Sequence, residues 1–334
     1  VDAYIGVNEL DRLAGLISED AKEEKEFKRV LTTGGHYEFL KIADGCDKRC
    51  TYCIIPYIRG SYKSRPMEEL VTEAEYLAGL GVKELILVAQ ETTVYGTDLY
   101  GKKMLPALLD KLCAIDGIEW IRLLYTYPEE IDDELIETIA DQKKIVHYLD
   151  MPIQHASDKI LKRMGRRTRR ADLEDIISRL RKRIPDIALR TSLISGFPGE
   201  DEEDQIQMLD FVTKAGFDRL GVFPYSQEED TPAAQMEDQI PEEVKTSRRD
   251  ELMELQQEIA FEKAQEMVGQ VLTVMIEGKV ADEDTYVART YRDAPGVDGY
   301  LFLNTTASLV TGDLAKVLVT DANEYDLIGE MYHE

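Results

Sequence analysis

Short apolar runs alternate with amphipathic helical stretches from Tyr37 onward, and this alternation limits the possible folds more than any other feature of the sequence. Six strand-like runs occupy residues 38–42, 85–88, 120–125, 145–149, 188–194 and 220–223. Helical patterns separate them, for example at 67–80, directly after Pro66, and at 132–140. Strands that alternate with helices form a parallel sheet, because parallel neighbours require a long crossover connection. We therefore predict an α/β fold built as a closed or partly closed barrel.

The pattern changes near the C-terminus. Pro241 opens a helical stretch over 242–268, and after Gly269 the apolar residues alternate with polar ones. Five short strands are expected at 271–276, 286–289, 300–303, 315–319 and 325–329. Five strands in so short a segment predict a small β-barrel of the oligonucleotide-binding kind. We therefore divide the chain into 1–36, 37–240, 241–268 and 269–334, in which 1–36 holds a short helical pattern (Leu10, Leu13, Leu16, Ile17), a charged run (19–29) and a linker.

Cysteine usage points to a metal rather than to disulfides. The chain of 334 residues has four cysteines, and three of them lie within eight positions, at Cys46, Cys50 and Cys53. No apolar run approaches the roughly 20 residues of a membrane-spanning helix, and no export signal is visible. We expect a cytoplasmic protein without membrane contact. Because residue 1 is Val rather than Met, we treat the chain as a fragment or a trimmed form.

The three clustered cysteines follow the first predicted strand directly. They would therefore lie at the carboxyl end of that strand, where α/β barrels place their chemistry. Three thiolates can hold three corners of a 4Fe-4S cluster and leave one iron open to a small molecule. A zinc knuckle would need a second cysteine pair or a spaced histidine, and a ferredoxin normally supplies a fourth cysteine. Cys113 lies in an apolar helical pattern and is expected to pack in the core.

The spacing Cys-x-x-x-Cys-x-x-Cys after the first strand of a six-unit barrel resembles the radical S-adenosylmethionine (SAM) superfamily. That resemblance implies a 4Fe-4S cluster on Cys46, Cys50 and Cys53 whose open iron binds the amino and carboxylate groups of SAM. One-electron reduction then cleaves SAM to methionine and a 5′-deoxyadenosyl radical, which abstracts a hydrogen atom. The resemblance also implies that Tyr52 packs near the adenine and that a protein such as flavodoxin or ferredoxin supplies the electron.

Three further stretches resemble methylthiotransferases: 89–96, 150–156 and 190–200, which follow the second, fourth and fifth predicted strands. This resemblance implies contacts of Gln90 and Glu91 with the methionyl end of SAM, of Gln154 with the ribose, and of Ser192 and the Gly196 turn with the ribose and adenine. Residues 196–199 also fit an ordinary turn. His155 fits a structural hydrogen bond as well as it fits a ligand or base role.

Charge bears on the substrate class. The net charge is −26, and residues 269–334 hold 12 acidic against 4 basic residues, a net of −8. A barrel that grips RNA should be basic. The terminal barrel therefore resembles a TRAM domain turned toward a basic protein, and 289–295 resembles the RimO-type enzymes, which modify an aspartate of small-subunit ribosomal protein twelve. A transfer RNA adenine is the alternative substrate, and a metal-stabilised RNA-binding module is the alternative outside the enzymes.

A run of basic residues does not decide between these substrates. Seven basic residues at 159–170 are expected to form a solvated helix face paired with nearby acids.

Members of the family also carry an N-terminal domain whose three cysteines bind a second 4Fe-4S cluster, which handles the transferred sulfur. Since no cysteine precedes Cys46, residues 1–36 resemble only the end of that domain, and the second cluster is expected only in that missing domain.

Overall fold

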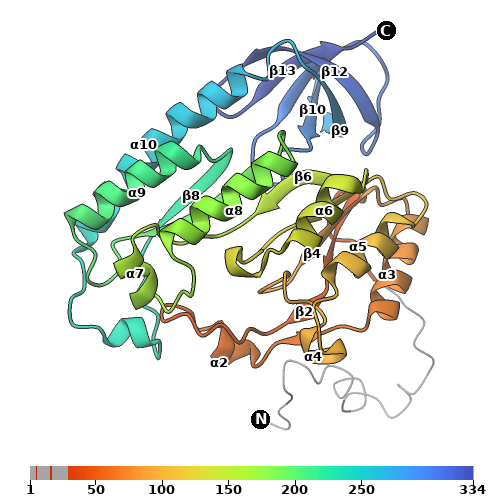
Figure 1. Cartoon of the computed structure of the whole chain (residues 1–334). Coiled ribbons are helices and arrows are strands. Elements are labelled where there is room, and N and C mark those ends of the chain that lie inside the picture. Colours follow the sequence, from red (N-terminus) through yellow and green to blue (C-terminus); the bar gives the residue numbers. More distant parts are fainter. Residues whose placement is uncertain (1–4, 6–15, 17–28, 334) are drawn as a thin grey trace.

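The computed structural model describes residues 5, 16 and 29–333. The expected helix near 10–17, apart from Leu16, and nearly all of the charged run at 19–29 lie outside the described residues. From residue 37 onward, strands and helices alternate as the sequence predicts, and Figure 1 shows two parts joined by one long helix.

A six-stranded parallel sheet forms the larger part. Its strands are β1 (Tyr37–Lys41), β4 (Glu84–Val88), β5 (Trp120–Leu123), β6 (Ile145–Asp150), β7 (Ala188–Ser195) and β8 (Arg219–Pro224). They pair in the order β1-β4-β5-β6-β7-β8, so each strand lies beside its predecessor and β1 and β8 are the two edges. The sheet is thus a partial barrel, which confirms the predicted fold class.

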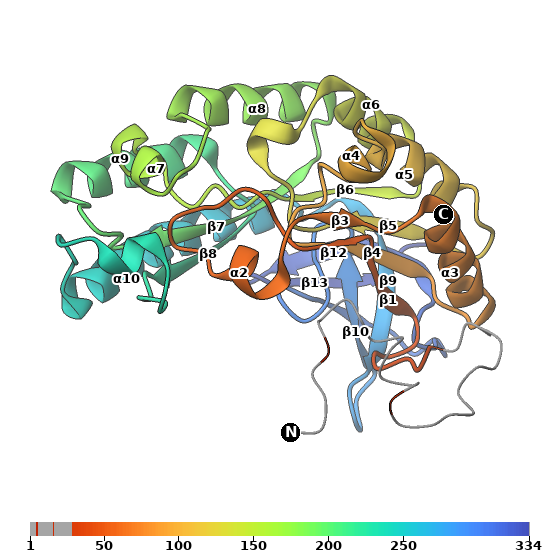
Figure 2. The same cartoon turned by 90° about the horizontal axis from the view of Figure 1, so that it is seen from below.

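Helices cover the outer side of the sheet, as Figure 2 shows for α5, α6 and α8. The longer ones are α3 (Met67–Gly79), α5 (Leu105–Cys113), α6 (Asp133–Asp141), α8 (Arg170–Arg183) and α9 (Glu202–Ala215). Shorter elements lie near the cysteines: the hairpin of β2 (Ala43–Asp44) and β3 (Lys63–Ser64), and helices α2 (Ile55–Arg59), α4 (Thr97–Tyr100) and α7 (Asp158–Arg163).

Local sequence explains where these helices begin. The Asp132 side chain accepts a hydrogen bond from the backbone N–H of Leu135 and caps α6. Asp201 and Asp204 form a reciprocal capping box at the start of α9. The apolar faces of these helices and of the strands share one core, and Cys113 packs against it from the end of α5, as the sequence indicates.

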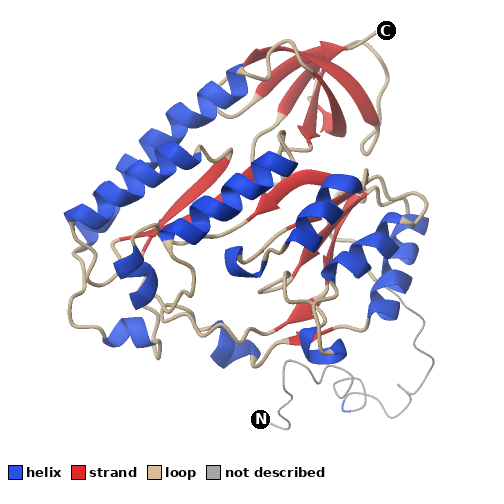
Figure 3. Cartoon of the chain, viewed as in Figure 1, coloured by secondary structure: helices blue, strands red, loops and turns tan. Residues whose placement is uncertain are grey.

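The smaller part is a closed five-stranded β-barrel. Its strands are β9 (Val271–Lys279), β10 (Thr285–Thr290), β11 (Leu301–Asn304), β12 (Leu314–Ala322) and β13 (Leu327–Met331), in the order β10-β11-β13-β12-β9. Helix α10 (Glu242–Gln265) leads into it, and Figure 3 shows this helix running along the edge of the larger part to the small barrel. The barrel has its own apolar core, so all five expected strands and the connecting helix are present. Among the helices of the described chain, none combines the length and apolarity that crossing a bilayer requires.

The small barrel packs against the amino ends of the sheet strands, at the opposite end from the cysteines (Figure 1). At the centre of this contact Glu84, the first residue of β4, lies between two arginines. Its carboxylate accepts hydrogen bonds from Arg122 Nε of β5 at 2.7 Å and from Arg289 Nη2 of β10 at 2.6 Å. All three side chains are fully buried.

Further polar contacts surround this triad. The Glu277 carboxylate of β9 accepts a hydrogen bond from Arg289 Nε at 2.8 Å, and its other oxygen lies 3.0 Å from His36 Nε2. Other pairs across the contact are Arg219 with Asp293, Arg292 with Asp218, and Tyr148 with Asp298. Met275 and Ala294 of the small barrel share an apolar cluster with Trp120 and Tyr148 of the sheet. The small barrel therefore closes the amino end of the larger one.

We predict that Glu84→Ala lowers the free energy of unfolding by about 3–5 kcal/mol, because it leaves two buried guanidinium groups without their shared carboxylate. Urea denaturation followed by circular dichroism measures the change. Glu119→Ala is the matched control, since Glu119 is exposed beside the same strands and its loss should change the free energy by less than about 0.5 kcal/mol. Equal midpoints for the two variants would contradict the assigned role of the triad.

Candidate functional site

The loop that carries the three cysteines is held by backbone hydrogen bonds. Cys46 N–H donates to Gly60 O at 3.2 Å, and Thr51 N–H donates to Met164 O at 2.9 Å. The preceding Gly45 has φ +76°, and a Cβ there would lie 2.3 Å from Ser61 O, so only glycine fits. The loop follows β1 and β2 at the carboxyl end of the sheet, as predicted.

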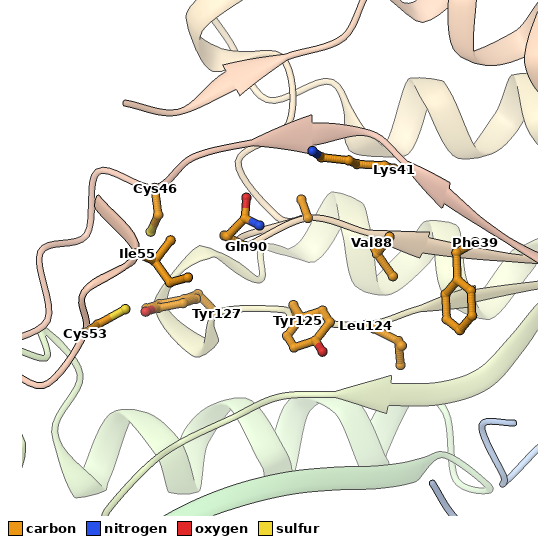
Figure 4. Close-up of a pocket in the computed structure, with 11 residues that line it drawn as sticks. Phe39, Lys41, Cys46, Cys53, Ile55, Val88, Gln90, Leu124, Tyr125 and Tyr127 are labelled. Atoms are coloured by element: carbon orange, nitrogen blue, oxygen red, sulfur yellow. The ribbon is translucent and has the colours of Figure 1, made fainter. Parts of the chain in front are cut away.

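Cys46 and Cys53 line a cavity of about 540 Å³ on the inner side of the sheet (Figure 4). Its wall comes from β1, β4 and β5 and from the segments that follow them, and it includes Phe39, Val88, Gln90, Leu124, Tyr125 and Tyr127. Figure 4 shows the thiols, Gln90 and Tyr127 at one end and Phe39 at the other. The thiols therefore lie at one end of a cavity whose farther wall is largely apolar and also includes Lys41.

Cys50 contacts a different set of groups. Its Sγ lies 3.3 Å from the hydroxyl oxygen of Tyr127. The Arg166 guanidinium stacks over the Tyr127 ring at 4.2 Å from the centroid. Burial raises the pKa of Tyr127 well above its usual value, so its hydroxyl stays protonated. Tyr52 packs against the apolar cluster of Ile160, Met164, Phe197, Tyr225 and Ala233.

Gln90 and Glu91 face two different cavities. Gln90 lines the cavity of Cys46 and Cys53, whereas Glu91 lines a second one of about 330 Å³ with Cys46, Lys48 and Arg167. Lys48 forms ion pairs with Glu130 and, at 3.8 Å each, with Glu91 and Glu129. The two residues expected at one end of SAM therefore lie on either side of Cys46.

Several buried polar atoms near the thiols lack hydrogen-bond partners within the described chain. They are Gln90 Oε1, Glu91 Oε2, Tyr62 Oη, and Nε and Nη1 of Arg166. Buried polar atoms are rarely left unpaired in native proteins, because each costs about 1–3 kcal/mol. Their concentration around three thiols fits a site that is completed by a polar ligand.

The thiols themselves fit a cluster whose iron ions supply positive charge to the bound sulfurs. Burial raises the pKa of the Cys46 thiol to about 11 and also raises the pKa of Cys53, so their thiolates need a metal at neutral pH. No three His, Cys, Asp or Glu side chains of residues 29–333 are grouped as for a single metal ion. A 4Fe-4S cluster binds each thiolate through a different iron, and its ligands need not converge on one point.

Gln154 and Ser192 lie side by side. Gln154 N–H donates to Ser192 O at 2.9 Å, and Gln154 has φ +70°, a conformation that is uncommon for residues other than glycine. Ser192 lies within β7 (Ala188–Ser195), the strand that the sequence predicts at 188–194. The structure thus brings these two predicted residues together beyond the ends of β6 and within β7.

The Gly196 turn has a structural explanation of its own. Gly196 N–H donates to Glu200 Oε2 at 2.8 Å, and a Cβ at its φ of +69° would lie 2.3 Å from Lys245 Cγ of α10. The close approach of that helix therefore requires glycine here. Contact of this turn with the ribose or adenine stays a prediction.

His155 makes a local hydrogen bond after β6. Its Nδ1 accepts a hydrogen bond from Ser157 N–H at 2.9 Å, which places its proton on Nε2, 3.4 Å from Glu200 Oε2. The ring is fully buried. Nδ1 thus makes a structural hydrogen bond, whereas Nε2 has no hydrogen-bond partner among the described residues. Both roles that the sequence leaves open therefore remain compatible with the contacts.

The basic run at 159–170 is mostly paired or exposed, as expected. Lys159, Arg163 and Arg170 form ion pairs with carboxylates of other segments, and Lys162, Arg167 and Arg169 are exposed. Arg166 is the exception, since it is buried beside Tyr127 and Cys50.

Sequence reasoning missed Lys48, Tyr127 and Arg166. Lys48 lies inside the cysteine motif, and Tyr127 follows β5 at the end of the sheet where the cysteines lie. The rule that parallel strands end at one face could have identified both. Arg166 carried no such signal, because its burial depends on the packing of distant segments.

Comparisons with known proteins agree with this geometry. A family model described as the radical SAM superfamily matches residues 40–212, and one described as the TRAM domain matches 268–331. The ribosomal protein uS12 methylthiotransferase RimO of Lachnoclostridium phytofermentans is 60% identical over 98% of this chain and 78% of its own length. The protein of that name from Acetivibrio thermocellus is 51% identical over 100% and 78%. A solved structure of the radical SAM methyltransferase TsrM from Kitasatospora setae has a TM-score of 0.48 and 18% identity over 74% of this chain and 42% of its own, too low to support an argument.

We predict that Glu91 makes the iron-free protein less stable as the pH rises. Burial raises the pKa of Glu91 to about 7 from 4.5, so the folded protein holds this proton more tightly than the unfolded chain does between these values. Stability should therefore fall as the pH rises through this window, by about 1.4 kcal/mol per pKa unit. In Glu91→Gln this contribution should be absent. Urea titrations at about pH 5 and about pH 8 measure it, and parallel pH profiles for the two proteins would count against it.

Proposed function

Since the chain belongs to the RimO-type methylthiotransferases of the radical SAM superfamily, we propose that it adds a methylthio group to the β-carbon of an aspartate of ribosomal protein uS12. The observation that carries this proposal is the grouping of three thiols and several unpartnered polar side chains around a cavity at the carboxyl end of the sheet. Parallel α/β barrels place their reactions at this end.

The cofactors of this enzyme class are a 4Fe-4S cluster and SAM, which together supply a radical able to remove a hydrogen atom from an unactivated carbon. In our proposal Cys46, Cys50 and Cys53 hold the cluster. Gln90 faces the same cavity and would orient the methionyl group through its unpartnered Oε1 and its amide N–H₂. The second 4Fe-4S cluster, expected only in an N-terminal domain, stays a prediction.

The remaining predicted residues would contact the rest of SAM. Gln154, which follows β6, and Ser192, within β7, lie together and would contact the ribose, and Tyr52 and the Gly196 turn would border the adenine. The apolar part of the cavity, near Phe39 and Leu124, would keep water away from the reacting carbon.

A basic protein suits the small barrel better than a nucleic acid does. Of its four basic residues, Arg289 and Arg292 are buried in the contact with the larger barrel, where they bond Glu84 and Asp218. Neither can reach a phosphate. Asp293 and Asp298 of the barrel are buried in the same contact, so the remaining residues of the barrel keep a large acidic excess. This excess favours a basic ribosomal protein over a transfer RNA adenine, the second candidate substrate.

The other partners belong to the same proposal. A flavodoxin or ferredoxin would deliver the electron, since the cluster must be reduced before each turnover. A ribosomal substrate would place the enzyme in the cytoplasm, where ribosomes are assembled.

We predict that deuterium on the β-carbon of the target aspartate of uS12 appears in 5′-deoxyadenosine. The reconstituted protein is incubated anaerobically with SAM, a strong reductant and the labelled uS12, and the product is analysed by mass spectrometry. This readout follows hydrogen abstraction directly and needs no sulfur transfer. Transfer from a deuterated transfer RNA adenine instead would favour the second candidate, and a protein that binds iron and sulfide but yields no 5′-deoxyadenosine would rule out both.

We also predict that Cys50→Ala abolishes 5′-deoxyadenosine formation while the barrel stays folded, because it removes one of three cluster ligands. Iron content, the visible absorption of the cluster and circular dichroism measure the change. Cys113→Ala is the matched control, since Cys113 lies at the end of α5 and packs against the core. Unchanged SAM cleavage in Cys50→Ala would refute the ligand assignment.

A further inference from the structure

We propose that Tyr127 and Arg166 form a positioning pair that raises the reduction potential of the cluster through the sulfur of Cys50. The inference rests on the proposed function, because it requires a cluster on Cys46, Cys50 and Cys53. It assigns a role to a hydroxyl group and a buried cation for which the fold offers no structural explanation.

Tyr127 provides a hydrogen bond to the ligand sulfur. Its hydroxyl oxygen lies 3.3 Å from Cys50 Sγ, within the range of an O–H···S bond. Once Cys50 is a thiolate, the sulfur can only accept, so the Tyr127 hydroxyl donates. Hydrogen bonds to cluster sulfurs are among the factors that set the potential of iron–sulfur proteins. The donor favours the reduced state because the sulfur carries more negative charge there.

Arg166 is a buried cation with no carboxylate partner among residues 29–333. Only its Nη2 is bonded, to Pro152 O at 2.9 Å, and Nε and Nη1 have no partner. A buried, uncompensated guanidinium is costly unless an anion completes its surroundings. A 4Fe-4S cluster with three thiolate ligands is such an anion, and its negative charge increases on reduction.

Two cations, Arg166 and Lys48, lie over the ring of Tyr127. Arg166 lies 4.2 Å from the ring centroid and Lys48 lies 4.9 Å from it. Lys48 is offset by Glu91, Glu129 and Glu130, all within its ion-pair distance. Glu129 acts on Arg166 from a longer distance, but no carboxylate of the described residues forms an ion pair with it. Arg166 therefore supplies the positive charge without an ion pair on this side of Cys50, and its field also strengthens the Tyr127 hydroxyl as a donor.

The backbone holds Arg166 in place relative to the cysteine loop. Thr51, the residue after Cys50, donates through its backbone N–H to Met164 O and through its hydroxyl to Arg163 O, both at 2.9 Å. Arg166 N–H donates to Leu161 O at 2.9 Å. The guanidinium thus belongs to a segment bonded directly to the cysteine loop and does not swing freely in solvent.

The test is the midpoint potential of the reconstituted cluster, measured without SAM by a redox titration monitored by electron paramagnetic resonance. Tyr127→Phe keeps the ring under Arg166 and removes only the donor, and Arg166→Met removes only the cation. We expect each change to lower the ratio of reduced to oxidised cluster about tenfold at a fixed potential, equivalent to about 59 mV for one electron. Arg166→Lys should recover part of the loss because it keeps the charge.

Two matched controls test whether the effect is local. Tyr57→Phe removes an exposed hydroxyl close to Cys53 in sequence, and Arg169→Met removes an exposed charge from the same segment as Arg166. Both should leave the potential unchanged. Circular dichroism and iron content establish that each variant folds and holds the cluster, and Tyr127→Phe still tests the proposal if Arg166→Met does not fold.

The outcomes separate this inference from the proposed function. An unchanged potential in Tyr127→Phe with an intact cluster would overturn the inference alone. A shift in the Arg166 variants that appears only after SAM is added would assign Arg166 to SAM and overturn it as well. Failure of the unaltered protein to assemble any cluster would overturn the proposed function together with it.

Discussion

The buried triad of Arg122, Glu84 and Arg289 fixes how the two barrels are joined, and the rest of the structure depends on it. Two guanidinium groups share one carboxylate at the amino end of the sheet, and Glu277 compensates the second positive charge. A buried ion pair contributes little net stability, because desolvation offsets most of the attraction. Its effect is orientation, since any other docking of the small barrel would leave at least one buried charge unpaired.

This arrangement divides the molecule into two ends with different tasks. The amino ends of the strands are occupied by the contact with the small barrel, so that the carboxyl ends remain available for chemistry. There the surroundings differ from those of the chain as a whole, whose net charge is −26. Cys50 lies beside the neutral phenol of Tyr127, and the buried Arg166 stacks on the ring of that tyrosine. An acidic protein has thus buried an arginine where an anionic cofactor would bind.

The sequence predicted the strands well because each is a compact apolar run, and it predicted the cysteine loop because three thiols in eight positions have few explanations. It failed where long-range packing decides. Arg166 belongs to a basic run that is otherwise paired or exposed, and only the approach of β5 and the cysteine loop buries it. Gln90 and Glu91 line different cavities, and their expected contacts with the methionyl end of SAM stay a prediction. The glycine at 196 was read through a motif, whereas the close approach of α10 also requires it.

The position of the small barrel has a consequence for the choice of target residue. The barrel and the thiols lie at opposite ends of strands of four to eight residues, which corresponds to roughly 17–20 Å for a typical strand. A protein bound to the small barrel could place in the cavity of the thiols only those residues that lie on a loop or tail long enough to span this distance. Binding to the small barrel would raise the concentration, at the cavity of the thiols, of those substrate residues that lie at the right distance from the bound segment. It would exclude chemically identical residues at other distances. The target residue would then be selected by its distance from the segment bound to the small barrel as much as by the shape of the pocket.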